Sequence, residues 1–302
     1  MKLFSQKDFN AAYLLLLLPP LFWAGNTVLA RGIADLIPPV AMSFWRWTLA
    51  LTMLAPFTWK QVARDLPQIR QHWQITLLIS LFGISSFNTL LYTAAQSTTA
   101  LNIALTQSVM PAIIVGLSYL FYRDRISRRQ FIAVHICIAG AIIIVFHGDL
   151  ERLQQLNFVT GDLLMLLAVC FYALYSVLLR KRPQVHPLSF LTVTFMVGVV
   201  SLFPLYLWEL SYAAPLEFNR QVLFSLLYVG LCPSILAYLF WNRGIEQIGV
   251  NKAGLYINLI PLFASLMAII FLGEQFQGYH LYGILLIVSG LLIFNWPDKT
   301  TA

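Results

Sequence analysis

Polar side chains that could hold a solute recur inside the long apolar stretches of this sequence. Arg46 stands in the middle of one stretch between Trp45 and Trp47, and Asn88 and Tyr92 occupy another. Charged and amide groups are costly inside a membrane, so such positions are candidates for a functional site. Arg46 could bind an anionic or zwitterionic group, or it could bond to backbone carbonyls at a broken helix. We favour the second, structural interpretation.

The polar pair Asn88 and Tyr92 has a counterpart later in the chain. Residues four apart share one face of a helix, and Tyr238 and Asn242 repeat the pair in swapped order 150 residues on, with Trp241 between them. A cavity on a pseudo-two-fold axis would need such symmetry. The alternative is that these groups only bond across helix interfaces; we favour the cavity.

Further polar and aromatic residues extend this candidate cavity. Some of them flank Pro111 and Pro261, and a proline within a span frees a carbonyl and bends the helix. A kink that serves packing alone explains these prolines equally well. The other candidate substrate-binding residues are Trp23, Asn26, Gln107, Tyr172, Tyr175, Tyr256 and Asn258.

Acidic residues stand at the ends of the apolar stretches. We expect Asp124 and Glu274 to be gating residues that pair with basic loop residues, one at each mouth of the cavity, and Asp162 to mark a helix start. The cysteines lack metal-ligand spacing, and no motif for hydrolysis or ATP binding is intact. We therefore expect no catalytic residue, no metal, no cofactor and no enzymatic activity.

The composition places these residues in a membrane. Of the 302 residues, 59% are hydrophobic and only 10% are charged, whereas soluble domains carry about 25% charged residues. This excludes a soluble enzyme and a disordered chain. The net charge of +7 is explained by basic loops, so we expect the lipid bilayer, and no nucleic acid, as a partner.

A span needs about 20 mostly apolar residues, and the sequence predicts ten of them. Polar clusters such as Arg64-Asp65 separate them. Lys and Arg gather at the termini and in alternate loops, while the other loops hold only Arg31, Arg152 and Arg220. This bias predicts that both termini are cytoplasmic. The predicted spans are Ala11–Ala30, Val40–Phe57, Ile75–Thr93, Leu101–Phe121, Phe131–Phe146, Thr160–Leu179, Leu188–Trp208, Val222–Asn242, Ala253–Leu272 and His280–Trp296.

Ten spans divide into two halves, 1–150 and 151–302, that match at an offset of about 150 residues. An odd number of spans in each half forces the halves into opposite orientations, the plan of many secondary transporters. Small residues at Ala133 and Gly140 recur at Gly283 and Gly290. Such stripes allow close helix packing within the bundle, and a homodimer contact is the alternative.

Short motifs stand at Leu21–Asn26, Pro39, Arg46, Leu272-Gly273-Glu274, Gly283 and Gly290. With these residues, the chain resembles the EamA-type ten-helix exporters of the drug/metabolite transporter superfamily over roughly residues 13–296. Two departures are Asp124, where the family has Glu, and Arg123, where it has Gly. The resemblance implies a central cavity surrounded by the first, third, fourth, sixth, eighth and ninth spans, and a bacterial cytoplasmic (inner) membrane location.

The sequence thus predicts an all-α integral membrane protein that works as a secondary transporter. By resemblance it exports a small metabolite through alternating access. A cavity rich in Trp, Tyr, Asn and Gln suits an amino acid or a similar amphipathic solute. The alternatives are a membrane-embedded enzyme that acts on a lipid and a passive channel.

Overall fold

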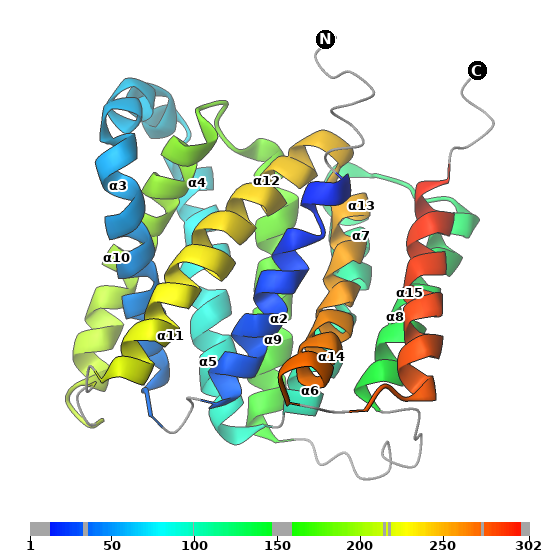
Figure 1. Cartoon of the computed structure of the whole chain (residues 1–302). Coiled ribbons are helices and arrows are strands. Elements are labelled where there is room, and N and C mark those ends of the chain that lie inside the picture. The colour runs from blue at the N-terminus through cyan, green and yellow to red at the C-terminus, as the bar shows by residue number, and fades with distance from the viewer. Residues whose placement is uncertain are drawn as a thin grey trace.

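The computed structural model describes residues 13–32, 36–98, 100–146, 159–213, 216, 219–272 and 275–296. Every regular element in these ranges is helical, and the helices form one bundle in which the first and the last described residues lie on the same side (Figure 1). The elements are α2 (Leu18–Gly32), α3 (Pro39–Gln71), α4 (Trp73–Ser80), η1 (Leu81–Ser86), α5 (Phe87–Ser97), α6 (Ala100–Ser108), α7 (Met110–Tyr122), α8 (Arg128–Val145), α9 (Thr160–Leu178), η3 (Leu179–Lys181), α10 (Pro187–Glu209), α11 (Arg220–Gly230), η4 (Leu231–Leu236), α12 (Ala237–Ile248), α13 (Val250–Gly254), η5 (Leu255–Asn258), α14 (Leu259–Leu272) and α15 (Gly278–Asn295).

The helical structure explains how this chain can be stable in a lipid bilayer. A helix pairs its own backbone N–H and C=O groups, and the hydrocarbon layer offers them no other hydrogen-bond partner. Within the described residues, nine helical stretches are long and apolar enough to cross a membrane. The protein is therefore an all-helical membrane protein. The other long helix, α3, carries Arg46 and its flanking indoles, which lower its apolar character, and it packs against α10 and α11.

Helix α3 is longer than the predicted span Val40–Phe57, because it continues to Gln71. Arg64 and Asp65, which the sequence places in a loop, lie inside this helix, so the prediction of a loop there is wrong. The extension is rich in good helix formers, and a helix needs no apolar residues to continue outside a membrane. A tertiary contact also holds it, because Asp65 accepts a hydrogen bond from the backbone N–H of His186 at 3.1 Å.

Helix ends follow local side-chain chemistry. Ser127 and Gln130 form a reciprocal capping box at the start of α8. Asp162 accepts the backbone N–H of Val159 at 2.8 Å at the start of α9, so it marks a helix start as expected. Arg123 ends α7 with a φ of 58°, a left-handed conformation that favours glycine. This geometry gives a physical reason for the glycine expected at that position.

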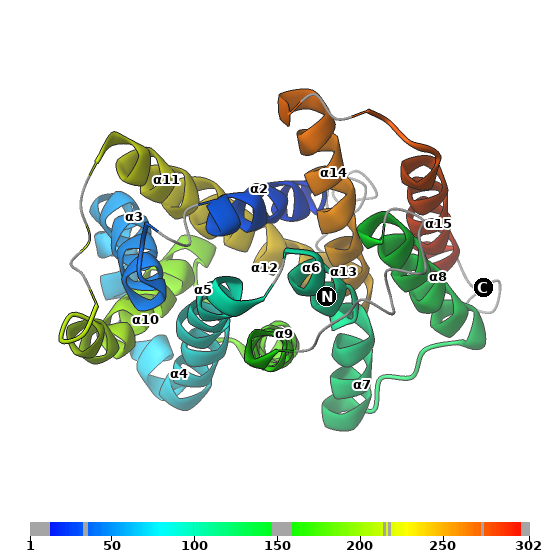
Figure 2. The ribbon, with the colours of Figure 1, turned by 90° about the horizontal axis from the view of Figure 1, so that it is seen from below.

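The two halves of the chain pack in equivalent ways. The π-helical turns η1 and η4 lie 150 residues apart and interrupt equivalent helices. Contacts between α5 and α9 are mirrored by those between α12 and α2, and contacts between α7 and α9 by those between α14 and α2. Seen from below, α2, α5, α9 and α12 lie around the centre of the bundle (Figure 2). The internal repeat in the sequence thus corresponds to a repeat in the three-dimensional structure.

Helices α8 and α15 pack side by side at one edge of the bundle in both views (Figures 1 and 2). A Cβ atom added to Gly140 would lie 2.9 Å from the carbonyl oxygen of Gly283, and one added to Gly290 would lie 2.9 Å from that of Ala133. The stripe of small residues therefore lets these two backbones approach closely, as the packing interpretation requires.

We expect Gly140→Ala to lower the stability of the folded protein by about 1–3 kcal/mol, because the new methyl group meets backbone that cannot move away. Gly116→Ala on α7 is the matched control, since nothing lies within 4 Å of its Cβ position, and the better helix propensity of alanine should leave that variant unchanged or slightly more stable. The measurement is the thermal unfolding midpoint in detergent. Equal midpoints for the two variants would contradict this account.

Candidate substrate-binding site

The π-helical turns η1 and η4 each expose one backbone carbonyl at the centre of the bundle. The carbonyl oxygen of Gly83 accepts a 2.5 Å hydrogen bond from the Tyr238 hydroxyl. Its equivalent 150 residues later, the carbonyl of Pro233, accepts bonds from Trp23 Nε1 at 3.2 Å and Arg46 Nη2 at 3.0 Å. A π-helical turn disturbs the regular helix ladder and often marks a functional site. Here each turn supplies an acceptor for a buried side chain of another helix.

Arg46 is 1% exposed, and its guanidinium donates to four groups of the protein. Besides Pro233, it donates to Ser234 Oγ at 2.7 Å, Tyr92 Oη at 2.8 Å and Asn26 Oδ1 at 3.2 Å. These contacts tie α3 to α2, α5 and η4. They include a backbone carbonyl at an interrupted helix, the arrangement that the structural interpretation of Arg46 describes. A buried charge requires such partners because neither lipid nor bulk water solvates it.

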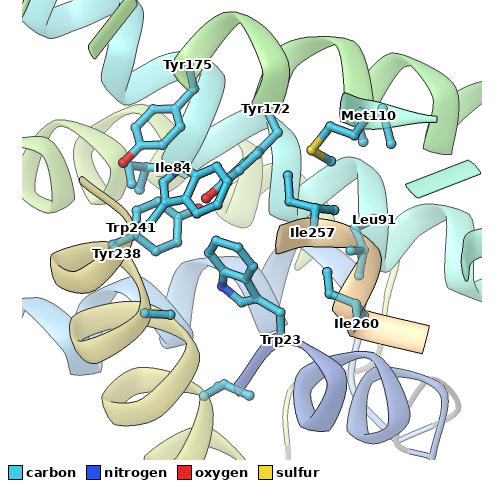
Figure 3. Close-up of a cluster of buried hydrophobic side chains, with 14 of the residues drawn as sticks. Trp23, Ile84, Leu91, Met110, Tyr172, Tyr175, Tyr238, Trp241, Ile257 and Ile260 are labelled. Carbon is cyan, nitrogen blue, oxygen red and sulfur yellow. The ribbon is translucent and has the colours of Figure 1, made fainter. Parts of the chain in front are cut away.

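A cluster of aromatic rings lies beside this network. The rings of Tyr172, Tyr175, Tyr238 and Trp241 gather next to that of Trp23 (Figure 3). Trp23 meets Trp241 edge-on with the ring centres 5.3 Å apart, and it meets Tyr172 in the same way at 5.5 Å. Edge-to-face contacts of this kind are favourable between buried rings. The cluster fills the space between α2, α9 and α12.

A first hollow of about 20 Å³ opens next to the aromatic cluster. It is far smaller than a typical small-molecule site, so a solute that binds here must widen it. One wall is polar, and the rest is aromatic or aliphatic. The lining residues are Trp23, Asn26, Thr27, Phe87, Asn88, Leu91, Gln107, Met110, Tyr172, Ile257 and Ile260.

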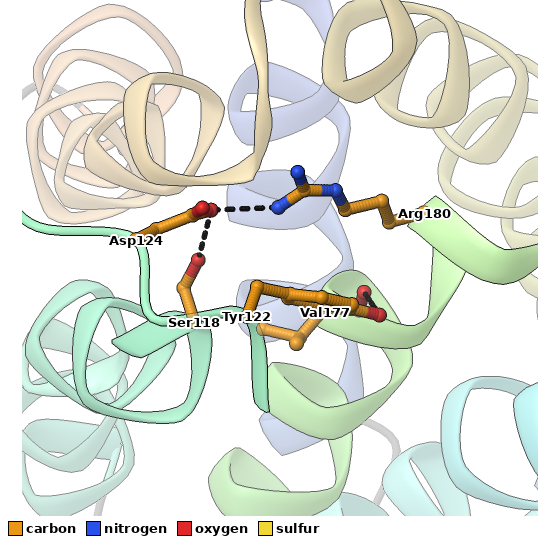
Figure 4. Close-up of polar contacts among 5 residues, drawn as sticks. All are labelled: Ser118, Tyr122, Asp124, Val177 and Arg180. Carbon is orange, nitrogen blue, oxygen red and sulfur yellow. Dashed lines mark hydrogen bonds and ion pairs between the residues drawn. The ribbon is translucent and has the colours of Figure 1, made fainter. Parts of the chain in front are cut away.

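A second hollow of about 450 Å³ lies at the ends of α7, α9 and α12, and its lining includes four charged residues, Asp124, Arg180, Arg182 and Glu246. Asp124 and Arg180 form an ion pair at 2.8 Å, and Ser118 donates to the same carboxylate oxygen at 2.9 Å (Figure 4). Arg182 and Glu246 form another pair at 2.7 Å. Asp124 thus has the basic loop partner that the sequence predicted for it.

The aromatic cluster separates the two hollows. Tyr172 lines the first, and its ring centre lies 5.2 Å from that of Tyr175. The Tyr175 hydroxyl donates a 2.5 Å hydrogen bond to Asn242, which lines the second hollow. A solute that passes from one hollow to the other would have to displace this short series of side chains.

The structure brings part of the predicted set together. Glu274 lies outside the described residues. Tyr256 and Asn258 are buried in η5 but line neither hollow, and both amide atoms of Asn258 lack a hydrogen-bond partner among the described residues. Of the others, those that line the first hollow are Trp23, Asn26, Asn88, Gln107 and Tyr172. Those buried behind it or between the hollows are Arg46, Tyr92, Tyr175, Tyr238 and Trp241.

The sequence pattern does not reveal several residues of the site. Ser234 and the carbonyls of Gly83 and Pro233 hold Arg46 and Tyr238 in place. The repeat offset relates Gly83 to Pro233 and could have revealed the pair. Glu209 was also missed; it is 2% exposed and accepts the backbone N–H groups of Val40 and Ala41 at the start of α3.

The fold and the two hollows define a multi-pass helical membrane protein with a central cavity. The chain belongs to the EamA-like transporter family, whose model matches residues 10–146 and again 159–296. This is a family of transporters and not of enzymes.

Individual relatives agree with this assignment. The uncharacterized transporter YyaM of Bacillus subtilis is 25% identical, with 93% of this chain and 92% of that protein covered. Protein PecM of Dickeya dadantii is 30% identical, with 77% and 76% covered. A solved crystal structure shares the fold at a TM-score of 0.76 and 17% identity, with 94% of this chain and 97% of that chain covered.

We expect Arg46→Lys to destabilise the protein by about 2 kcal/mol or more. A lysine keeps the charge but cannot reach Ser234, Asn26 and Pro233 together, and each lost hydrogen bond to a buried charge is worth roughly 1.5–3 kcal/mol. Arg70→Lys, at an exposed position, is the control and should unfold like the wild type. The thermal midpoint in detergent measures both, and a wild-type midpoint for Arg46→Lys would contradict the network.

Proposed function

We propose that this protein is a secondary transporter that exports a small amphipathic metabolite, an amino acid or a similar solute, by alternating access. The observation that carries the proposal is the pair of hollows on either side of one aromatic cluster. A carrier needs a central site that is closed on at least one side at any time. The side chains between the hollows favour such a carrier over an open channel.

We propose ten spans in two inverted repeats, with α3 as the tenth, and both termini in the cytoplasm of a bacterial cell. The first and the last described residues lie on the same side of the bundle (Figure 1). This shared side and the excess of Lys and Arg in alternate loops support this topology. In this orientation the second hollow faces the cytoplasm, because Arg180 and Arg182 line it.

The residues of the first hollow are the proposed substrate-binding residues. Trp23 and Tyr172 offer ring faces and edges, and Asn26, Asn88 and Gln107 offer amides. Between the hollows, Tyr175 and Asn242 form the proposed inner barrier. Equivalent π-helical turns in α4–α5 and α11–α12 are places where these helices can bend as the cavity changes sides.

Asp124 is the proposed cytoplasmic gating residue, together with a neighbouring pair that the sequence did not reveal. The side chains of Arg180 and Asp124 are 54% and 34% exposed, whereas that of Arg182 is only 8% exposed against 41% for Glu246. Exposed ion pairs contribute little, about 0–1 kcal/mol. The Arg182–Glu246 pair should therefore hold the mouth more firmly.

The transport function can be tested by counterflow in proteoliposomes. We expect saturable, trans-stimulated uptake of at least one labelled solute from a panel that includes threonine, phenylalanine and glutamine. Asn88→Leu should lower the uptake about tenfold, because one lost hydrogen bond in the binding site costs on the order of 1.4 kcal/mol. Asn295→Leu, at the end of α15 and away from both hollows, is the matched control. Uptake that does not saturate would indicate a channel.

The gate can be tested by comparing Arg180→Gln with Arg182→Gln in the same assay. Loss of the exposed pair should change the rate less than about fivefold, in keeping with its energy of up to about 1 kcal/mol. Loss of the less exposed Arg182 should change it more. The readout is the counterflow rate at saturating solute. A larger effect of Arg180→Gln would assign the gate to Asp124 alone.

A further inference from the structure

The amide orientations of two residues in the first hollow are set by their neighbours. Asn26 Oδ1 accepts hydrogen bonds from Arg46 at 3.2 Å and from the Tyr92 hydroxyl at 3.0 Å. A guanidinium can only donate, so the oxygen of Asn26 must face it. The Nδ2 group of Asn26 is then left as a donor, and it has no partner among the described residues.

Asn88 turns its Nδ2 group, and not its oxygen, toward its neighbour in the protein. The Tyr238 hydroxyl gives its single proton to the carbonyl of Gly83 at 2.5 Å, so it can only accept from Asn88 Nδ2, which lies at 3.4 Å. The Oδ1 atom of Asn88 is thereby left as an acceptor without a partner among the described residues. One wall of the hollow thus offers an N–H donor at Asn26 and a C=O acceptor at Asn88.

Gln107 adds a complete amide to the same hollow. Asn26 and Gln107 are each 4% exposed and Asn88 is 1% exposed. Within the described part of the chain, the Gln107 side chain makes no hydrogen bond, and the buried Tyr172 hydroxyl has no partner either. Of these groups, only the Tyr172 hydroxyl is fully enclosed without a partner among the described residues, which is costly. The free amide atoms of Asn26, Asn88 and Gln107 belong to residues that line the same hollow, where a ligand with complementary polar groups would complete them.

The lining of the hollow carries no charge. None of the described residues that line it is Asp, Glu, Lys, Arg or His. The nearby cation, Arg46, already donates to Ser234, Tyr92, Asn26 and Pro233. A carboxylate would therefore meet no cation, and it would place its oxygens against Asn88 Oδ1. An ammonium group would be desolvated without a counter-charge.

The remaining walls offer flat surfaces to a ring, which can enter once the hollow, about 20 Å³ here, widens. Trp23, Phe87 and Tyr172 present aromatic surfaces, with the Phe87 and Tyr172 ring centres 4.6 Å apart. Ile257 and Ile260 add aliphatic surface. Flat apolar groups pack well in such surroundings, and directed polar groups then select the ligand.

We propose that the substrate is an uncharged, planar aromatic compound with a carboxamide-like or lactam-like edge. Its C=O accepts from Asn26, its N–H donates to Asn88, and Gln107 pairs with the same edge. This inference rests on the proposed transport function. Among the amphipathic solutes of the proposed function, it excludes zwitterionic amino acids and keeps neutral amides.

The test compares two probes of the same shape, indole-2-carboxamide and indole-2-carboxylate, for binding to the full chain in nanodiscs by calorimetry. We expect the carboxamide to bind at least about tenfold more tightly, because a site with directed polar groups rejects a ligand that leaves them unpaired. Gln107→Leu should weaken carboxamide binding about tenfold and leave the binding of indole, which lacks the amide, within about twofold.

Equal or tighter binding of the carboxylate, or no binding of either probe, would overturn the proposal. The comparison on the wild-type protein decides this even where Gln107→Leu does not fold. A counterflow measurement tests the transport function separately from the neutral-amide substrate. Carriage of zwitterionic amino acids with no preference for the carboxamide would leave the transporter standing and refute the neutral-amide substrate. Selective carboxamide binding without counterflow of any solute would support the site and refute the transport function.

Discussion

The charge of Arg46 has to be solvated by the protein itself, and much of the centre of the molecule is arranged to do so. Its guanidinium reaches three other elements, α2, α5 and η4, through one amide, two hydroxyls and one backbone carbonyl. Because Asn26 must turn its oxygen toward this cation, Arg46 also decides which atom Asn26 offers to the first hollow. A residue that does not line the hollow thereby shapes its chemistry, and its loss would disturb packing and recognition together.

The two π-helical turns place a free backbone carbonyl at equivalent positions of the two repeats. Each turn presents a carbonyl that the regular helix would keep for itself, and the two carbonyls, Gly83 and Pro233, are taken by different partners. Pro233 receives Trp23 and Arg46, whereas Gly83 receives Tyr238. The halves therefore share a backbone plan while their side chains make an asymmetric site. Such asymmetry lets a pseudo-symmetric scaffold bind a substrate that has no symmetry of its own.

The parts of the bundle differ in what they contribute. Helices α8 and α15 meet through small residues at backbone distance, which suits a rigid element at the edge. The centre, by contrast, contains the unpartnered Tyr172 hydroxyl beside the first hollow and two ion pairs beside the second. Membership in the EamA-like transporter family agrees with this division, since a carrier needs a stable frame and a centre that rearranges.

The sequence by itself determined the class of fold, most span positions and the internal repeat, because in lipid each backbone group must bond locally and the apolar runs record this directly. It also placed Trp23 and Gln107 in the candidate cavity, through polar residues within spans. Only the tertiary structure decided which way Asn26 and Asn88 face, because their partners come from distant helices. Span ends that continue outside the membrane, as in α3, also could not be read from an apolar pattern, since no apolar residues are needed there.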